Sequence, residues 1–178
     1  MTEPYFSAAL AQAVDDLGPN IWSGTGYRHT SPRRNALVGA GAAISGGRWN
    51  PAGISTVYLA VPRTTCLAEF RRMAESQGHG LASFLPRMLH TVAVAGLAVV
   101  DLASVQALAS VNLERADLAG PWAPCQAVGA AAQFLGLGGV LAPSSTGTGV
   151  VIAVFETHVH PGQLLLEHSE LIDPAGLS

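Results

Sequence analysis

The chain has 178 residues, of which 49% are hydrophobic and 12% charged, and its formal net charge is −3. This length suits one domain, and the charge lacks the basic surface that a nucleic-acid backbone requires. We therefore predict no direct nucleic-acid partner. The longest apolar run, 91–100, is interrupted by Gly96 and is shorter than the about 20 residues that cross a bilayer, so we predict no membrane partner. Residues 1–4 are acidic rather than basic, unlike a secretory signal, which favours a cytoplasmic protein.

Neither the cysteines nor the histidines form a metal-binding pattern. Cys66 and Cys125 lie far apart in the chain, which favours small core residues over a disulfide or a nucleophile. His158 and His160 would share one face of a strand, but the nearby carboxylate is only that of Glu156. We therefore predict a solvated strand face there and no metal site.

Apolar spacing and turn residues predict the following elements in chain order. The expected helices are 6–17, a helix that follows Pro62 and ends near Gln77, a short helix at 81–88 broken at Pro86, and 104–110 and 125–137. The expected strands are 21–22 with 25–30, 56–61, 90–94 and 97–102 around Ala95-Gly96, 140–142 and 150–157. In residues 31–45 the apolar residues have no regular spacing, so we predict a long loop, or a loop with a short helix.

This order of elements is mixed, because the strands do not alternate regularly with helices. It favours an α+β fold over a doubly wound sheet. We expect one compact domain over residues 1–178, with a mixed β-sheet core and flanking helices. Within it, residues 1–20 would carry an N-terminal helix and residues 163–178 would form a C-terminal extension.

The densest group of polar functional side chains lies in residues 46–69, in a chain otherwise poor in charge. Two glycines before Arg48 allow unusual backbone conformations and close approach of a ligand, so we expect Arg48 at the rim of a turn. The following strand carries Tyr58 on the face opposite to its neighbours. Glu69 falls near the second turn of the next helix. A turn, a strand end and an early helical turn are thus predicted to share one neighbourhood.

Each of these residues also has a purely structural interpretation. Arg28 would be a surface residue of its strand, and Glu69 would pair with Arg72 three positions later, which contributes only about 0.2–0.5 kcal/mol. Trp49 and Asn50 would either pack in the core and fix Arg48 or contact a ligand directly. The sequence alone leaves these alternatives open.

Together these residues resemble the RES-domain family, the toxin half of bacterial toxin–antitoxin pairs. The resemblance rests on motifs that extend over most of the chain and is weakest before Trp22 and after Gly162. The motifs are Tyr27-Arg28, Gly46-Gly47-Arg48-Trp49-Asn50-Pro51, Val57-Tyr58-Leu59-Ala60, Leu67-Ala68-Glu69, Cys125-Gln126-Ala127-Val128-Gly129 and Pro143-Ser144. Within the family the chain looks most similar to the mycobacterial-type members that degrade NAD.

The resemblance implies a fold related to the ADP-ribosyltransferases and cleavage of the nicotinamide–ribose bond of NAD. NAD would be a substrate, with inorganic phosphate or water as acceptor and no bound cofactor. A cognate antitoxin would cover the site. The resemblance leaves open whether the protein forms a homo-oligomer. The implied catalytic residues are Arg28, Arg48, Tyr58 and Glu69, and the implied NAD-binding residues are Tyr27, Gly47, Trp49, Asn50, Gln126 and Ser144.

The chemistry of NAD explains these residue types. Arginine binds phosphate oxygens in bidentate fashion, so Arg28 and Arg48 suit the pyrophosphate or the attacking phosphate. Tyr58 can lie against the cationic nicotinamide ring. Glu69 can hold a ribose hydroxyl and stabilise the positive charge that grows at the ribose C1. No Gly-x-Gly-x-x-Gly follows a strand, which leaves hydride transfer without support.

Two alternatives to this activity remain at the level of sequence. One is an ADP-ribosyltransferase that modifies a protein. The other is a catalytically impaired RES-like interaction module, because close relatives have a serine where this chain has Ala123-Pro124 before Cys125. Ser144 would then match the family's later Pro-Ser block.

Overall fold

The computed structural model describes residues 5–177, so the expectations for residues 1–4 and 178 lie outside it. The strands of this part are β1 Asn20–Thr30, β2 Thr56–Val61, β3 Met88–Asp101, β4 Gly139–Pro143, β5 Val150–Phe155 and β6 Leu164–Leu171. The α-helices are α1 Ala8–Leu17, α2 Ala40–Ser45, α3 Arg63–Ser76, α4 Val105–Ser110 and α5 Ala123–Phe134. Single 3₁₀ turns are η1 Leu81–Phe84, η2 Arg115–Ala119, η3 Glu156–His158 and η4 Pro174–Leu177. No helix within residues 5–177 is long and apolar enough to cross a membrane.

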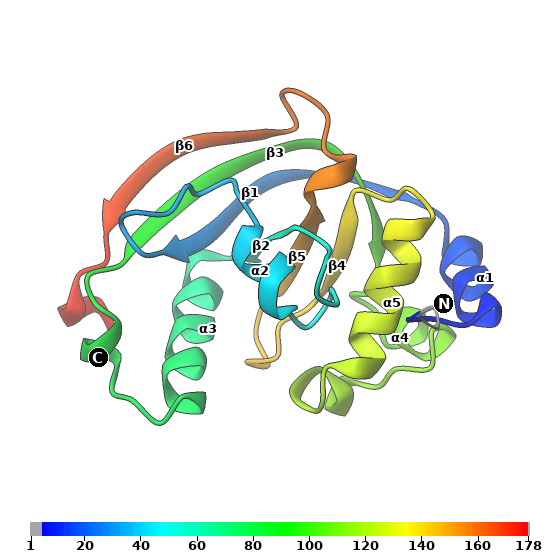
Figure 1. The fold of residues 1–178 in the computed structure, drawn as a ribbon, viewed down its shortest axis with the longest axis horizontal. Coiled ribbons are helices and arrows are strands. Elements are labelled where there is room, and N and C mark those ends of the chain that lie inside the picture. The colour runs from blue at the N-terminus through cyan, green and yellow to red at the C-terminus, as the bar shows by residue number, and fades with distance from the viewer. Residues whose placement is uncertain (1–4, 178) are drawn as a thin grey trace.

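The strands close on themselves because β1 pairs with both β2 and β3. β2 pairs with β5, β5 with β4 and β4 with β3, and of these contacts only β3–β4 is parallel. β6 adds to the first half of β3. In Figure 1, β6, β3 and β1 arch over β2, β5 and β4, with α3 below one end of the arch and α1, α4 and α5 below the other. This mixed sheet with separate helices confirms the predicted α+β class.

Three buried clusters hold the helices and strands together. The first takes alternate side chains from β2, β3, β4 and β5, including Val57, Val99 and Ile152. The second joins α1, α4 and α5 to the strand ends through residues such as Leu108. The third packs Phe70 of α3 against β2 and β3. Helices α3 and α5 thus pack against the same face of β2 and β5, opposite to the face that the first cluster buries.

The predicted break in the strand at Ala95-Gly96 is wrong, because β3 runs without interruption from Met88 to Asp101. Gly96 adopts φ +63°, a conformation that glycine tolerates without steric cost. Opposite it, β1 has a register shift between Trp22 and Gly24. The Ser23 hydroxyl accepts a hydrogen bond from the Gly96 amide at 2.8 Å, so the distortion leaves this donor satisfied.

Other differences from the sequence expectations are local. The short helix expected at 81–88 is the turn η1, and Met88 already belongs to β3. His158 lies in η3 and not on a strand, because β5 ends at Phe155. Within the expected extension 163–178, β6 joins the sheet beside β3. The loop at 31–45 contains the short helix α2, and the N-terminal helix spans Ala8–Leu17.

Helix α5 touches the turn at residues 47–50 through backbone atoms. A Cβ added at Gly129 would lie 1.7 Å from the Trp49 carbonyl oxygen, far inside any normal contact. The helix therefore approaches the turn only because residue 129 has no side chain. This contact fixes the position of Arg48, the neighbour of Trp49.

We predict that Gly129→Ala destabilises the protein by about 3 kcal/mol, because the added methyl must displace either the helix or the turn. Urea denaturation monitored by circular dichroism measures the loss. Gly80→Ala is the matched control, because its Cβ would meet nothing within 4 Å and Gly80 has an ordinary φ of −66°. Equal stabilities of the two variants would contradict the packing argument.

Candidate active site

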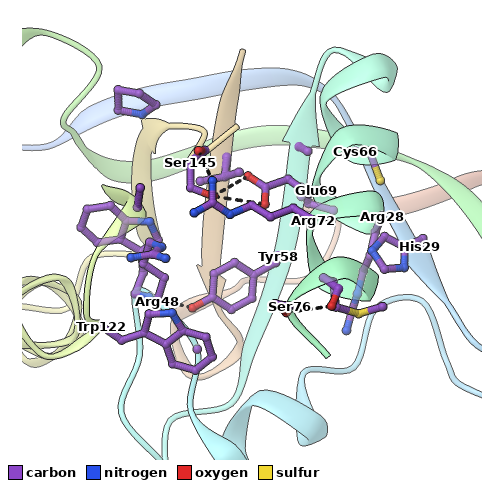
Figure 2. A pocket seen from close by; sticks show the side chains of 18 of the residues that line it. Arg28, His29, Arg48, Tyr58, Cys66, Glu69, Arg72, Ser76, Trp122 and Ser145 are labelled. Carbon is purple, nitrogen blue, oxygen red and sulfur yellow. Dashed lines mark hydrogen bonds between the residues drawn. The ribbon is translucent and has the colours of Figure 1, made fainter. Parts of the chain in front are cut away.

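A cavity of about 680 Å³ opens between α3 and the segment that links η2 to α5. β1, the turn at 47–49, β2 and the ends of β4 and β5 complete its lining. Of the ten residues predicted to act on NAD, seven line this cavity: Tyr27, Arg28, Gly47, Arg48, Trp49, Tyr58 and Glu69. The fold thus brings the predicted catalytic residues to one place, as Figure 2 shows for Arg28, Arg48, Tyr58 and Glu69.

The fully buried Asn50 side chain organises the turn that carries Arg48. Its amide nitrogen contacts the carbonyl oxygens of Ala42, Pro51 and Ile54 at 2.9–3.0 Å. Its side-chain oxygen accepts the Tyr58 hydroxyl proton at 2.7 Å. Asn50 therefore ties the turn to α2 and to strand β2. Substrate contact for Asn50 stays a prediction, because its side chain does not line the cavity.

Gln126 supports the same turn from helix α5. Its side-chain nitrogen donates to the carbonyl oxygens of Gly47 at 3.0 Å and Asn50 at 3.2 Å. Gln126 does not line the cavity either. A Cβ at Gly47 would come within 2.5 Å of the Tyr58 hydroxyl, so glycine is needed for this close approach.

The Tyr58 hydroxyl is fully engaged inside the protein. It donates to Asn50 and accepts the Trp49 amide proton at 2.9 Å. Burial raises the pKa of this hydroxyl above its ordinary value. The hydroxyl is therefore no proton donor to a substrate at neutral pH, and what Tyr58 offers to the cavity is its ring.

The two predicted arginines are held by backbone carbonyl groups. Arg28 donates to the carbonyl oxygens of Ala36 at 2.7 Å and Val38 at 3.1 Å, which ties the loop after β1 to the cavity. Desolvation lowers the pKa of Arg28, and the carboxylate of Glu156 opposes that shift. The loop itself is held to the same carboxylate, because Glu156 accepts the amide proton of Gly39 at 2.9 Å.

Arg48 reaches the cavity from the opposite side. It donates to the carbonyl oxygens of Asp117 at 3.3 Å and Gly120 at 3.0 Å, at the end of η2. Carbonyl groups at the end of a helical turn carry partial negative charge, so they stabilise the guanidinium without neutralising it. Each arginine keeps further N–H donors for an anion.

Glu69 projects from the second turn of α3 and is fixed by a hydroxyl. Ser144 Oγ donates to Glu69 Oε1 at 2.5 Å, and Ser145 Oγ lies 3.4 Å from both carboxylate oxygens. Since the single Ser144 proton goes to Glu69, the bond between Ser144 and Thr146 must use the proton of Thr146. The predicted NAD-binding residue Ser144 is thus buried behind Glu69 rather than in the cavity lining.

The alternative interpretation of Glu69 as a partner of Arg72 does not match these contacts. Within residues 5–177 the ionic contacts are Arg63 with Glu170 and His168 with Glu170. Arg72 instead donates to the Ser145 carbonyl oxygen at 2.6 Å, and its side chain lines the cavity.

Further cavity residues were not predicted as part of the site, among them Arg72, Ser145, Trp122 and His29. Arg72 is three positions after Glu69, so helical spacing alone could have placed both on one face of α3. His29 follows Arg28 on β1, and its ring packs at a tilt of 40° against the ring of Phe70, with centroids 4.7 Å apart. Trp122 sits in the turn before α5 and is 46% exposed.

Two other side chains near the cavity are not set up for proton transfer or nucleophilic attack. Cys66 lines the cavity, but burial, followed by the charge of Glu69, raises the pKa of its thiol to about 12. The thiol is therefore protonated at neutral pH. His29 Nδ1 lies 2.8 Å from Arg87 Nη2, which can only donate, so the ring proton of His29 is on Nε2. Within residues 5–177 no group of three or more His, Cys, Asp or Glu side chains could hold a metal ion.

Three comparisons with known proteins agree on one family. The model of the family described as RES domain matches residues 23–171. The NAD(+) phosphorylases MbcT of Mycobacterium tuberculosis H37Rv and Mycobacterium bovis are each 42% identical over 170 residues, which cover 93% of this chain and 91% of theirs. A crystal structure of the M. tuberculosis MbcT–MbcA toxin–antitoxin complex matches with a TM-score of 0.90, 41% identity and coverage of 96% of both chains.

We predict an acid-dependent loss of stability that depends on His29. Desolvation, followed by the charges of Arg87 and Arg28, lowers the pKa of His29 from 6.5 to about 3. The unfolded chain therefore binds this proton first, and stability present above pH 6.5 falls as the pH drops towards 3. Between pH 7.5 and 5 the loss due to His29 should be about 1–2 kcal/mol.

Urea denaturation at both pH values measures this loss. In His29→Gln the difference between the two pH values should shrink by that amount. His160→Gln, at an exposed residue, controls for replacing a histidine as such. The same pH difference in wild type and His29→Gln would contradict the assignment.

Proposed function

The chain belongs to the RES domain family, and on that premise we propose that it is a toxin that cleaves the nicotinamide–ribose bond of NAD. ADP-ribose is transferred to inorganic phosphate, so the protein depletes cellular NAD. The observation that carries this proposal is one cavity in which a fixed carboxylate, Glu69, faces the guanidinium groups and the Tyr58 ring. The relatives named NAD(+) phosphorylase support the same reaction.

The parts of NAD find matching groups in the cavity. Arg48 and Arg28 approach from opposite sides and suit the pyrophosphate, since both are fixed and positively charged. The Tyr58 ring offers a face to the cationic nicotinamide, an attraction of up to about 2 kcal/mol in a desolvated site. Glu69 binds a ribose hydroxyl and stabilises the positive charge on C1 as the bond to nicotinamide breaks.

The hydroxyl of Ser144 keeps Glu69 in place by a hydrogen bond to its carboxylate. In this chain Ala123 and Pro124 form the first turn of α5, and the hydroxyls near Glu69 come from Ser144 and Ser145. A carboxylate with this support favours the enzyme over an impaired interaction module. Analysis of the products distinguishes transfer of ADP-ribose to phosphate from its transfer to water or to a protein.

We predict that Glu69→Gln lowers NAD turnover by about 10²–10³ while leaving NAD affinity and folding nearly unchanged. Gln keeps the shape and can still accept the Ser144 proton, but it lacks the charge needed at the transition state. Nicotinamide release measures turnover, calorimetry measures NAD binding, and the melting temperature should stay within a few degrees.

Glu75→Gln is the matched control, because it removes an exposed carboxylate from the same helix. Mass spectrometry of the wild-type products identifies the acceptor: ADP-ribose phosphate, free ADP-ribose or a modified protein. Wild-type turnover in a folded Glu69→Gln protein would leave Glu69 without a catalytic role.

We further propose that a cognate antitoxin covers this cavity. The related MbcT forms a toxin–antitoxin complex with MbcA. Trp122 supplies an exposed apolar side chain beside the cavity, of the kind that protein interfaces bury.

Co-expression with the adjacent reading frame tests this partner. The partner should co-purify, block nicotinamide release and relieve growth arrest. Its binding should also protect Trp122 from acrylamide quenching, and the protection should vanish in Trp122→Phe. A co-purifying partner that leaves NAD cleavage and Trp122 quenching unchanged would show that it binds elsewhere.

A further inference from the structure

Arg72 belongs to a row of cavity residues along one face of α3. Glu69, Arg72, Met73, Ser76 and Gln77 all line the cavity, and their spacing of three or four residues places them on one side of the helix. Arg72 lies about 4.5 Å further along the helix axis than Glu69. Figure 2 shows the Arg72 and Glu69 side chains next to each other, with Ser145 opposite them.

The positive charge of Arg72 has no carboxylate partner among the ionic contacts of residues 5–177. In the described part of the chain, the Arg72 guanidinium donates from Nη1 to the Ser145 carbonyl oxygen at 2.6 Å. A guanidinium has five N–H donors, so the group is oriented by this contact and keeps most of its donors for a ligand. A fixed, half-buried cation in a cavity is suited to an anion.

The reaction brings two anions into the cavity, the pyrophosphate of NAD and the acceptor phosphate. Arg28 and Arg48 lie on other sides of the cavity and are each tied to two carbonyl groups. The acceptor must come close to the ribose C1, which Glu69 approaches. A phosphate beside a carboxylate is repelled unless a positive charge lies between or beside them.

Arg72 and Ser145 meet this requirement. Ser145 Oγ lies 3.4 Å from both oxygens of Glu69, longer than an ordinary hydroxyl hydrogen bond, so its proton is weakly held and can turn towards a phosphate oxygen. Arg72 supplies the positive charge next to Glu69. Water is always in great excess over phosphate, so transfer to phosphate requires a site that binds it.

We propose that Arg72 and Ser145 form the binding subsite for the phosphate acceptor, an inference that rests on the NAD cleavage proposed above. An oxygen lone pair of hydrogen phosphate forms the new bond to C1 of the ribose. The C1–N bond breaks, and its electron pair neutralises the ring nitrogen of the departing nicotinamide. The proton of the transferred phosphate stays on the product or passes to solvent.

Arg72→Gln should raise the KM for phosphate about 10- to 100-fold, because it removes charge-assisted contacts to one anion. The KM for NAD should change less than about twofold. Free ADP-ribose should increase among the products as water replaces phosphate. Arg72→Lys keeps the charge and a donor for the Ser145 carbonyl but lacks the planar fork, so it should fall between wild type and Arg72→Gln.

The experiment measures initial rates of nicotinamide release against phosphate at saturating NAD, and against NAD at saturating phosphate. Arg63→Gln is the matched control, since it removes the same charge from an exposed position of α3 outside the cavity. Melting temperatures of all variants verify folding. A raised KM for NAD with an unchanged KM for phosphate would overturn the proposal and place Arg72 at the pyrophosphate. Two unchanged KM values would overturn it as well.

Direct titration with inorganic phosphate, followed by ³¹P NMR in the absence of NAD, separates this proposal from the proposed function. Phosphate should bind wild type and Arg63→Gln and bind Arg72→Gln much more weakly. If the wild type binds phosphate through Arg72 but releases no nicotinamide, the anion-binding subsite is supported and the proposed NAD cleavage is contradicted. Equal phosphate binding by wild type and Arg72→Gln overturns the subsite even if NAD is cleaved.

Discussion

The buried side chain of Asn50 is the contact on which the cavity depends. Its amide nitrogen lies within hydrogen-bond distance of three carbonyl oxygens of the surrounding chain, and its side-chain oxygen accepts the Tyr58 hydroxyl proton. Removing it would leave several buried polar groups without partners, each at a cost of about 1–3 kcal/mol. The turn that carries Arg48, the ring of Tyr58 and helix α2 therefore keep their places together. Gln126 and Gly129 extend the same support to α5.

Support of this kind explains how a chain with few charges can hold three arginines around one carboxylate. The arginines contact backbone oxygens, and Glu69 is fixed by Ser144. The charges in the cavity are thus not neutralised by one another. Electrostatic stabilisation of a transition state requires such groups to be oriented before the substrate arrives, because reorganisation during the reaction would cost free energy.

The sequence predicted the cavity best where its residues are close together in the chain. The residues from Gly47 to Glu69 follow one turn, one strand and one helix, so local patterns were enough to bring Arg48, Tyr58 and Glu69 together. Contacts between distant residues could not be predicted in this way. Gln126 meets the turn across 79 positions, and Ser144 meets Glu69 across 75. In the fold, the residues of β6 are almost uniformly exposed, so this segment lacks the alternation of buried and exposed residues that marks a strand. Gly96 was interpreted as a turn residue although it lies within the continuous strand β3.

The backbone contacts of Arg28 and Arg48 also bear on how such a protein can diverge. Every residue type has a carbonyl group, so the surface positions 38 and 120 can change their side chains without releasing the arginines. The outer surface of these loops is free to vary with the partner that it meets, while the charges beneath stay fixed. A lineage could therefore exchange one protein inhibitor for another and keep the same chemistry.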